Sequence, residues 1–236
     1  MATEHKVVPH DEWVQARKEF LAREKDFTRQ RAALAQDRRD LPWEAVTKEY
    51  VFDGPDGKAA LPDLFDGCRQ LIIYHFMFPP EWDEGCPHCS FWADNFDGIP
   101  PHLRARHTAF AAVSRAPFPK LAGYAQRMGW SFPWFSSSGT DFNYDYGVAF
   151  TPEEVADGTA VYNYGSPAPG FTDREGVSVF YSGGDGQVFH TYSAYARGID
   201  MLNGAYNYID LVPKGRDEAG HDFTQFWVRR HDEYGS

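Results

Sequence analysis

The first part of the chain repeats a hydrophobic residue at every seventh position. The repeating residues are Trp13, Phe20, Phe27, Leu34 and Leu41. Because seven residues make about two turns of an α-helix, this spacing places all of them on one helical face. Asp11 is a suitable N-cap and Pro42 ends the pattern, so we expect one helix over residues 11–41. The second apolar seam of a coiled coil is missing, and we expect the helix to pack against its own domain or a second subunit.

From residue 50 onward, apolar runs of strand length alternate with segments of helical pattern. The predicted strands are residues 50–54, 71–78, 109–114, 131–134, 177–181 and 187–192. The predicted helices are residues 90–96, 119–128 and 199–207. The last two strands flank a Gly-Gly-Asp-Gly turn, which indicates a β-hairpin. This alternation predicts an α/β fold with a thioredoxin-like mixed central sheet flanked by helices.

Changes in hydrophobic pattern and polarity along the chain divide it into three parts. Residues 1–45 are expected to form an N-terminal helical extension, and residues 46–210 the thioredoxin-like domain. Residues 211–236 are polar and less regular, and we expect them to form a C-terminal tail packed on this domain.

Composition and charge narrow the classes of function. Hydrophobic residues make up 42% of the chain and aromatic residues 17%, which is enough for a substantial core without disulfides. The net charge of −11 opposes binding to nucleic acid or to an anionic membrane. The apolar run at residues 71–80 is far shorter than the roughly 20 residues of a membrane span, and no leader pattern is visible. We therefore expect a cytoplasmic protein, whose thiols are kept reduced.

The sequence Cys86-Pro87-His88-Cys89 is the strongest candidate for chemistry. Two cysteines three residues apart at the start of a helix can close a disulfide, and the helix N-terminus stabilises a thiolate on the first. A proline suits the first helical turn, and a histidine between the cysteines can add positive charge that lowers the first thiol's pKa. We predict Cys86 as the nucleophile, Cys89 as the resolving cysteine and His88 as the residue that tunes Cys86.

A metal site is the competing interpretation of the same cysteines. A closed zinc site needs four ligands, and the only other cysteine is Cys68, so zinc is disfavoured. Copper(I) accepts thiolates and low coordination numbers. Candidate third ligands are His75, on the strand before the cysteines, and His190, on the final hairpin. A protein with such a site would shuttle copper or use it for oxidation with O₂.

These motifs resemble a bacterial family catalogued as domain of unknown function 899. The segments that carry the resemblance are residues 75–78, 84–98, 114–117, 128–130, 136–137, 141–143, 146–148, 188–193, 195–198, 213–217 and 230–234. The likeness covers nearly the whole chain and implies a thioredoxin-like fold. It does not by itself imply a particular reaction.

A wider resemblance is to peroxiredoxins. Their motif places a proline seven residues, and a threonine or serine three residues, before the attacking cysteine. Pro79 and Cys86 keep the first spacing, whereas Asp83 replaces the hydroxyl residue that helps to position peroxide. Arg174 is a loose candidate for the active-site arginine of that family.

One departure from thioredoxins favours the metal interpretation. Thioredoxins have a cis-proline before the strand that faces the dithiol, where this chain has Gly176 and Val177. That proline protects the cysteines from metal. Copper-handling relatives with this fold use two cysteines and a distant histidine, which Cys86, Cys89 and His190 match by analogy.

The leading hypothesis is a thiol–disulfide oxidoreductase that needs no cofactor. Its substrate would be a disulfide-containing protein, a small thiol or an oxidised small molecule. The alternatives are a copper protein and a non-enzymatic interaction protein that uses the long N-terminal helix. Independently of the reaction, a homodimer through the N-terminal helix is possible from the sequence. Polar and aromatic side chains that could line a substrate pocket occur in residues 189–217: Tyr192, Tyr195, Arg197, Asp200 and Asp210. We favour the alternative, in which they make structural hydrogen bonds.

Overall fold

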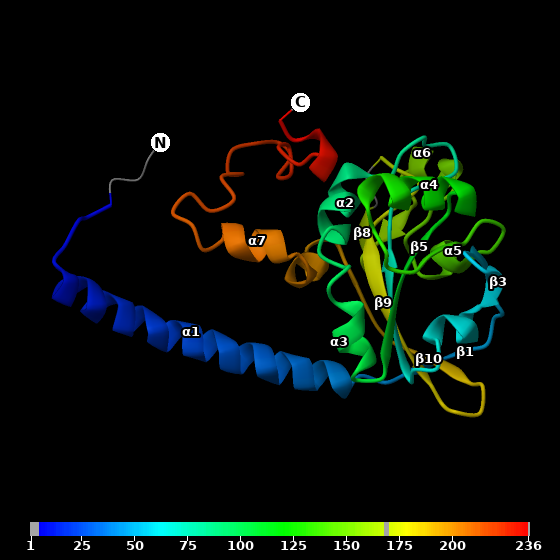
Figure 1. The fold of residues 1–236 in the computed structure, drawn as a ribbon, viewed down its shortest axis with the longest axis horizontal. Helices are drawn as coiled ribbons and strands as arrows, with labels where there is room; N and C mark the ends of the chain where they lie inside the picture. The colour runs from blue at the N-terminus through cyan, green and yellow to red at the C-terminus, as the bar shows by residue number, and fades with distance from the viewer. Residues whose placement is uncertain (1–4, 168–169, 236) are drawn as a thin grey trace. The chain divides into compact units, whose positions relative to one another are not determined.

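The computed structural model describes residues 5–167 and 170–235. It divides into two compact units, Met1–Pro42 and Trp43–Ser236, which we describe separately. The second unit is built around an eight-stranded mixed sheet (Figure 1). In spatial order its strands are β1 (Glu44–Val46), β10 (Val188–Tyr195), β9 (Gly176–Ser182), β4 (Gln70–His75), β5 (Thr108–Ser114), β6 (Trp134–Ser136), β2 (Val51–Gly54) and β3 (Gly57–Ala60).

The middle of this sheet has the thioredoxin-like arrangement. Strand β4 pairs in parallel with β5, and β5 pairs in parallel with β6. On its other side β4 pairs antiparallel with β9, which forms a hairpin with β10. The helices between the parallel strands are α2 (Pro87–Ala93), α3 (Pro100–Arg104) and α4 (Phe118–Met128). The predicted mixed sheet flanked by helices is therefore confirmed.

The remaining elements are short. They are η1 (Leu61–Phe65), α5 (Phe142–Asp145), α6 (Pro152–Ala156), η2 (Ala196–Leu202), α7 (Gly204–Ile209), η3 (His231–Glu233) and a small sheet of β7 (Val161–Tyr162) with β8 (Ser166–Pro167).

Alternate residues of β4 enter two separate hydrophobic clusters. Leu71 and Ile73 belong to a cluster with η1 and α5, whereas Tyr74 belongs to a cluster with α2, α4 and α7. This follows from the two-residue period of a strand, which points neighbouring side chains to opposite faces. The buried apolar run at residues 71–78 is confirmed, although the strand itself ends at His75.

Several boundaries differ from the sequence prediction. Helix α2 begins at Pro87 and includes Cys89, whereas the sequence pattern placed helix only from residue 90. The predicted strand 131–134 lies later, at β6. The predicted helix 199–207 is divided, because Asn203 ends η2 and its side chain caps α7 by accepting the Tyr206 N–H at 3.1 Å.

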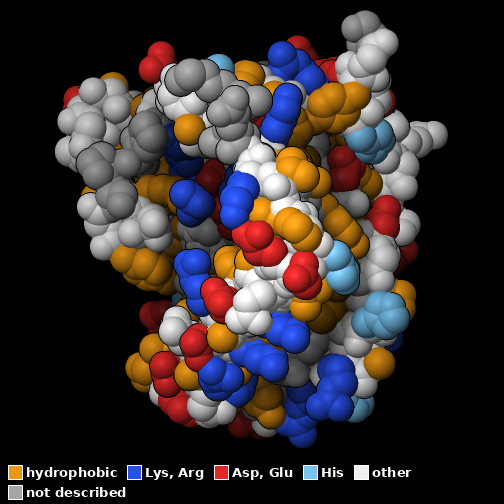
Figure 2. All heavy atoms as spheres, turned by 90° about the vertical axis from the view of Figure 1, so that its left-hand side faces the viewer, with side chains coloured by type: hydrophobic (Ala, Val, Ile, Leu, Met, Phe, Trp, Pro, Cys, Tyr) orange, Lys and Arg blue, Asp and Glu red, His pale blue; other side chains and the backbone are white. Residues whose placement is uncertain are grey.

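The N-terminal unit is the long helix α1 (His10–Arg39). Its N-cap is Pro9, so Asp11 lies in the first turn and not at the predicted cap position. No residue of α1 is buried, and four of the repeating residues form an exposed heptad stripe on it: Trp13, Phe20, Phe27 and Leu34. Leu41 is also exposed, but it follows the end of the helix. In the described part of the chain every helix is too short or too polar to cross a bilayer. On the face drawn in Figure 2, basic side chains lie among acidic and hydrophobic ones.

Candidate dithiol site

The chain geometry places both cysteines of the motif on the first turn of α2. Two prolines end the extended segment after β4, and the chain then returns through a short loop. Cys86 is the N-cap of α2, Pro87 occupies the first helical position, where no N–H is needed, and Cys89 completes the turn. Residues at this spacing share a helical face, so the two thiols meet.

Both cysteines are buried, but their sulfurs have different surroundings. Both cysteines are free thiols, and their residues are 5% and 2% exposed for Cys86 and Cys89. The Sγ of Cys89 accepts the backbone N–H of Met77 at 3.4 Å, which ties it to the segment after β4. Both cysteines are therefore buried, and Cys89 is the one whose sulfur is held by the segment after β4.

The environment separates the acidities of the two thiols. A hydrogen bond from the Cys89 thiol, together with the backbone N–H groups of Cys89 and His88, lowers the pKa of Cys86. Burial, followed by the interaction with Cys86, raises the pKa of Cys89 well above its ordinary value. The Glu175 carboxylate opposes ionisation of both sulfurs. These shifts favour Cys86 over Cys89 as the member of the pair that ionises first.

His88 does not supply the positive charge that we expected from the sequence. Burial and the nearby charge of Arg229 lower the pKa of its imidazole, so the ring is neutral at pH 7. Its ring packs edge-on against Phe223 with centroids 5.0 Å apart, and its Nδ1 is buried without a hydrogen-bond partner among the described residues. His88 helps to lower the pKa of Cys86 through its backbone N–H and not through its ring, and this contribution is smaller than that of the Cys89 thiol.

A pocket of about 610 Å³ opens over the dithiol. Its walls include both cysteines, His88 and residues from three distant segments of the chain. These are Tyr74, Met77, Trp82, Trp92, Phe171, Arg174, Glu175, Arg197, Asp200 and Phe223. Size, concavity and a lining that is largely apolar with a few polar side chains are typical of small-molecule sites. Tyr74, Trp82, Glu175 and Phe223 lie in no recognisable motif, so the sequence alone does not indicate them.

The loop before Cys86 is held by the C-terminal tail. Arg230 donates to the Gly85 carbonyl at 2.9 Å and to the Tyr124 hydroxyl at 2.8 Å. The same hydroxyl lies 2.9 Å from Ser90 Oγ, which donates to the Cys86 carbonyl at 2.8 Å. Residues 227 and 228 also pack into the cluster that contains the cysteines. The tail therefore positions the first turn of α2.

The candidate copper ligands are not brought to the cysteines. His75 Nε2 is 2.8 Å from Ser178 Oγ, which is 2.8 Å from Ser193 Oγ. Ser193 Oγ is in turn 2.8 Å from His190 Nε2. The two histidines are thus linked to each other by two hydroxyl groups. His75 packs at 5.6 Å against the ring of Phe142, in the cluster on the β4 face away from Tyr74 and the dithiol.

This arrangement does not fit the predicted three-ligand copper site. Within residues 5–167 and 170–235, no three His, Cys, Asp or Glu side chains lie together as a metal site requires. The physical reason is the strand period: His75 follows Tyr74, so the two side chains point to opposite faces of the sheet. Neither His75 nor His190 lies with Cys86 and Cys89 in this structure, so a three-ligand copper site stays a prediction that the described residues do not support.

Some of the other candidate residues from the sequence line the pocket, and others make contacts that hold the fold. Arg174, Arg197 and Asp200 line the pocket. Tyr195 has a structural role, because its hydroxyl donates to the Tyr146 carbonyl at 2.9 Å. Asp210 pairs with Arg216 at 2.8 Å, outside the pocket lining.

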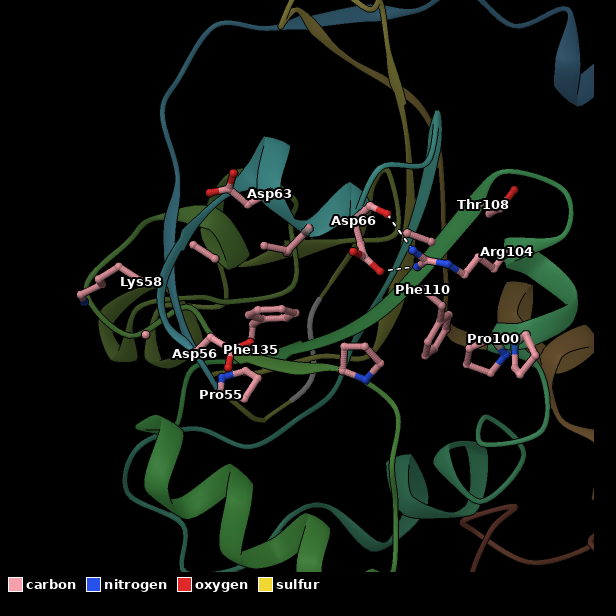
Figure 3. Close-up of a pocket in the computed structure, with 17 residues that line it drawn as sticks. Pro55, Asp56, Lys58, Asp63, Asp66, Pro100, Arg104, Thr108, Phe110 and Phe135 are labelled. Carbon is pink, nitrogen blue, oxygen red and sulfur yellow. Dashed lines mark hydrogen bonds and ion pairs between the residues drawn. The ribbon is translucent and has the colours of Figure 1, made fainter.

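Another pocket, of about 720 Å³, lies between the β2–β3 turn and α3 (Figure 3). Its lining is rich in proline and phenylalanine, and its Arg104 pairs with Asp66. None of the described residues that line it is a cysteine or a histidine. The pocket that contains the dithiol is therefore the candidate functional site.

Several solved structures resemble this chain. Peroxidoxin BcpB from Mycobacterium tuberculosis is 15% identical with a TM-score of 0.46, covering 72% of this chain and 97% of its own. The bacterioferritin comigratory protein of Xanthomonas campestris is 16% identical with a TM-score of 0.43, covering 69% and 93%. The yeast mitochondrial 1-Cys peroxiredoxin is 13% identical with a TM-score of 0.41, covering 66% and 70%.

No curated protein matches the chain. The model of the family described as bacterial protein of unknown function, DUF899, matches residues 2–234. That match spans nearly the whole chain and confirms the resemblance read from the motifs. The chain therefore belongs to the DUF899 family of bacterial proteins.

Proposed function

We propose that this protein is a thiol–disulfide oxidoreductase in which Cys86 and Cys89 exchange between dithiol and disulfide. The observation that carries the proposal is the pair of free thiols on one helical turn beneath a pocket, with the pKa of Cys86 lowered and that of Cys89 raised. A structural cysteine pair would not need a pocket or separated acidities.

The reaction balances without a cofactor. The Cys86 thiolate attacks one sulfur of a substrate disulfide, the substrate S–S bond breaks, and one substrate thiolate leaves. Cys89 then gives up its proton and attacks Cys86 Sγ, which releases the second substrate thiolate and leaves a Cys86–Cys89 disulfide. Two electrons pass from the protein to the substrate, and the two thiol protons end on the two products. An external dithiol restores the reduced protein, which suits a reducing compartment such as the cytoplasm.

Glu175 is suited to accept the proton of Cys89 during the second step. It lines the pocket, and its charge acts on Cys86, Cys89 and Tyr74. Because burial raises the pKa of Cys89, this thiol needs a proton acceptor before it can attack.

A redox titration with thiol counting tests the proposal. In buffers of increasing potential the protein should lose two of its three thiols in one two-electron transition, with Cys68 remaining free. Peptide mapping should find the disulfide between Cys86 and Cys89. Elemental analysis of the same sample addresses the copper alternative. Stoichiometric copper with no reversible disulfide would contradict our proposal.

We also propose that the heptad stripe of α1 pairs with α1 of a second copy. Acidic residues directly precede the first three stripe positions, as Glu12, Glu19 and Asp26, and arginines follow Trp13 and Phe27 by four residues, whereas Glu24 follows Phe20. In a parallel pair of helices these two flanks face each other and attract. A stripe of large exposed hydrophobic residues on a helix without buried residues needs such a partner.

Measurement of mass in solution tests this pairing. The wild-type chain is expected at twice its 26.8 kDa, whereas Phe20→Glu with Phe27→Glu should give a monomer, because charge on the stripe is costly to bury. The matched control is Lys18→Glu with Lys25→Glu, which changes charge on the same helix away from the stripe and should leave the dimer intact. A monomeric wild-type protein at micromolar concentration would contradict the pairing.

A further inference from the structure

We infer that the substrate is a small, largely apolar disulfide that enters the pocket, and not a disulfide on the surface of a folded protein. The inference rests on the proposed function and names the class of molecule that the dithiol acts on. Three independent features of the pocket support it: the depth of the sulfurs, the aromatic walls and a buried hydroxyl without an oxygen or nitrogen partner among the described residues.

The first feature is the depth of the reacting sulfur. Cys86 is only 5% exposed, and it forms part of the pocket lining. A disulfide held in a folded protein brings a large rigid surface with it, which would have to enter the pocket to reach this sulfur. A small molecule can occupy a space of about 610 Å³ without any change in the surrounding chain.

The second feature is the aromatic wall around the dithiol. Trp82, from the loop before Cys86, meets Phe171 edge to face with centroids 6.3 Å apart. On another side His88 meets Phe223 edge to face. Trp92 of α2 closes the pocket next to Cys89. These rings come from segments far apart in the sequence, so the fold assembles an aromatic wall over the cysteines, and the charged side chains of the lining stand beside it.

The third feature is the hydroxyl of Tyr74. This residue is completely buried and lines the pocket together with both cysteines; its Oη has no oxygen or nitrogen partner among the described residues, and the Cys89 thiol is the protein group that interacts with it. Burial raises the pKa of Tyr74 well above its ordinary value, so the hydroxyl keeps its proton and is a donor. Buried polar groups are usually satisfied, and a ligand atom in the pocket would satisfy this one. The substrate should therefore carry a hydrogen-bond acceptor beside its S–S bond.

The test compares two disulfides as substrates of the full chain, with dithiothreitol as the reductant. The small probe is 2,2′-dithiodipyridine, which is apolar and has a ring nitrogen beside the disulfide. The protein probe is insulin. Each rate is divided by the rate with dithiothreitol alone, which removes differences in intrinsic reactivity. We expect the normalised kcat/KM for the small probe to exceed that for insulin by at least about tenfold.

Two variants test the wall and the hydroxyl separately. Trp82→Ala should raise KM for the small probe several-fold with little effect on kcat, because it removes binding surface. Tyr74→Phe keeps the ring and should lower kcat/KM for the small probe by roughly tenfold, the factor for one buried hydrogen bond. The matched control is Tyr208→Phe, on a side chain that is 76% exposed, which should change nothing.

The outcomes separate this inference from the proposed function. Equal or faster normalised turnover of insulin would overturn the small-substrate inference and leave the oxidoreductase standing. Unchanged kinetics in both Trp82→Ala and Tyr74→Phe would also overturn it. Turnover of neither disulfide would overturn the oxidoreductase itself, and the inference with it.

Discussion

Replacing Cys86 by serine is expected to reduce disulfide turnover to the rate of dithiothreitol alone. Serine keeps the size and position of the side chain but cannot form the thiolate that starts the exchange. Loss of a nucleophile typically costs on the order of 10³-fold or more, because no other group replaces it. Turnover of a small disulfide, followed by absorbance, measures this directly.

Cys68→Ser is the matched control for this prediction. Cys68 is a half-buried thiol that is not part of the pocket lining, and its side chain packs beside the cluster that contains Leu71 and Ile73. Its replacement should leave turnover unchanged. Comparable activity in Cys86→Ser and the wild type, or loss of activity in Cys68→Ser alone, would assign the chemistry to a different thiol.

Adding one methyl group at Gly85 is expected to disturb both stability and reactivity. A Cβ at this position would lie 2.7 Å from Tyr124 Cε1 and 2.8 Å from Phe76 Cε1. Both rings are buried in the core, so they cannot turn away at low cost. Overpacking of this kind costs about 1–3 kcal/mol, and it displaces the backbone next to Cys86. Gly85→Ala should therefore lower the free energy of unfolding by that amount and slow alkylation of Cys86.

Gly98→Ala is the control for Gly85→Ala. It makes the same chemical change at an exposed glycine where an added Cβ has no atom within 4 Å. Denaturant unfolding should show wild-type stability for this variant. If Gly85→Ala were as stable and as reactive as Gly98→Ala, the tight packing of the loop against Tyr124 and Phe76 would not position the dithiol.

The parts of the fold that the sequence predicted are those set by local pattern. The buried strand at residues 71–78, the strand at 109–114, the helix at 119–128 and the final hairpin all have a clear period or turn signal. Strands β1 and β3 were missed, because they are short and lie at the two edges of the sheet. Their pairing depends on partners distant in sequence, and an edge strand needs little hydrophobic pattern of its own.

The candidate site could be predicted only in its reactive centre. The spacing of Cys86 and Cys89, and their position after a buried strand, are enough to predict them as the reactive pair. The pocket around them is a tertiary property: Tyr74, Glu175 and Phe223 come from separate segments and carry no motif. No local pattern could show that these segments converge.

The roles predicted for the three histidines show what the sequence cannot reveal about burial and packing. His88 was expected to be charged because it lies between two cysteines, but its burial, which the sequence does not reveal, keeps it neutral. His75 and His190 were expected near the dithiol, whereas the strand period directs them to another cluster. In each case the residue type suggested a role, a positive charge for one histidine and metal binding for the other two. The packing around each side chain does not favour that role.

The order of attack at the two cysteines is the central claim, and a trapped intermediate tests it most directly. In Cys89→Ser the second step is blocked, so the mixed disulfide with substrate should accumulate. Intact-mass and peptide analysis after incubation with a small disulfide should find one substrate moiety, attached to Cys86. Attachment to Cys68, or to no cysteine while turnover continues, would contradict the account.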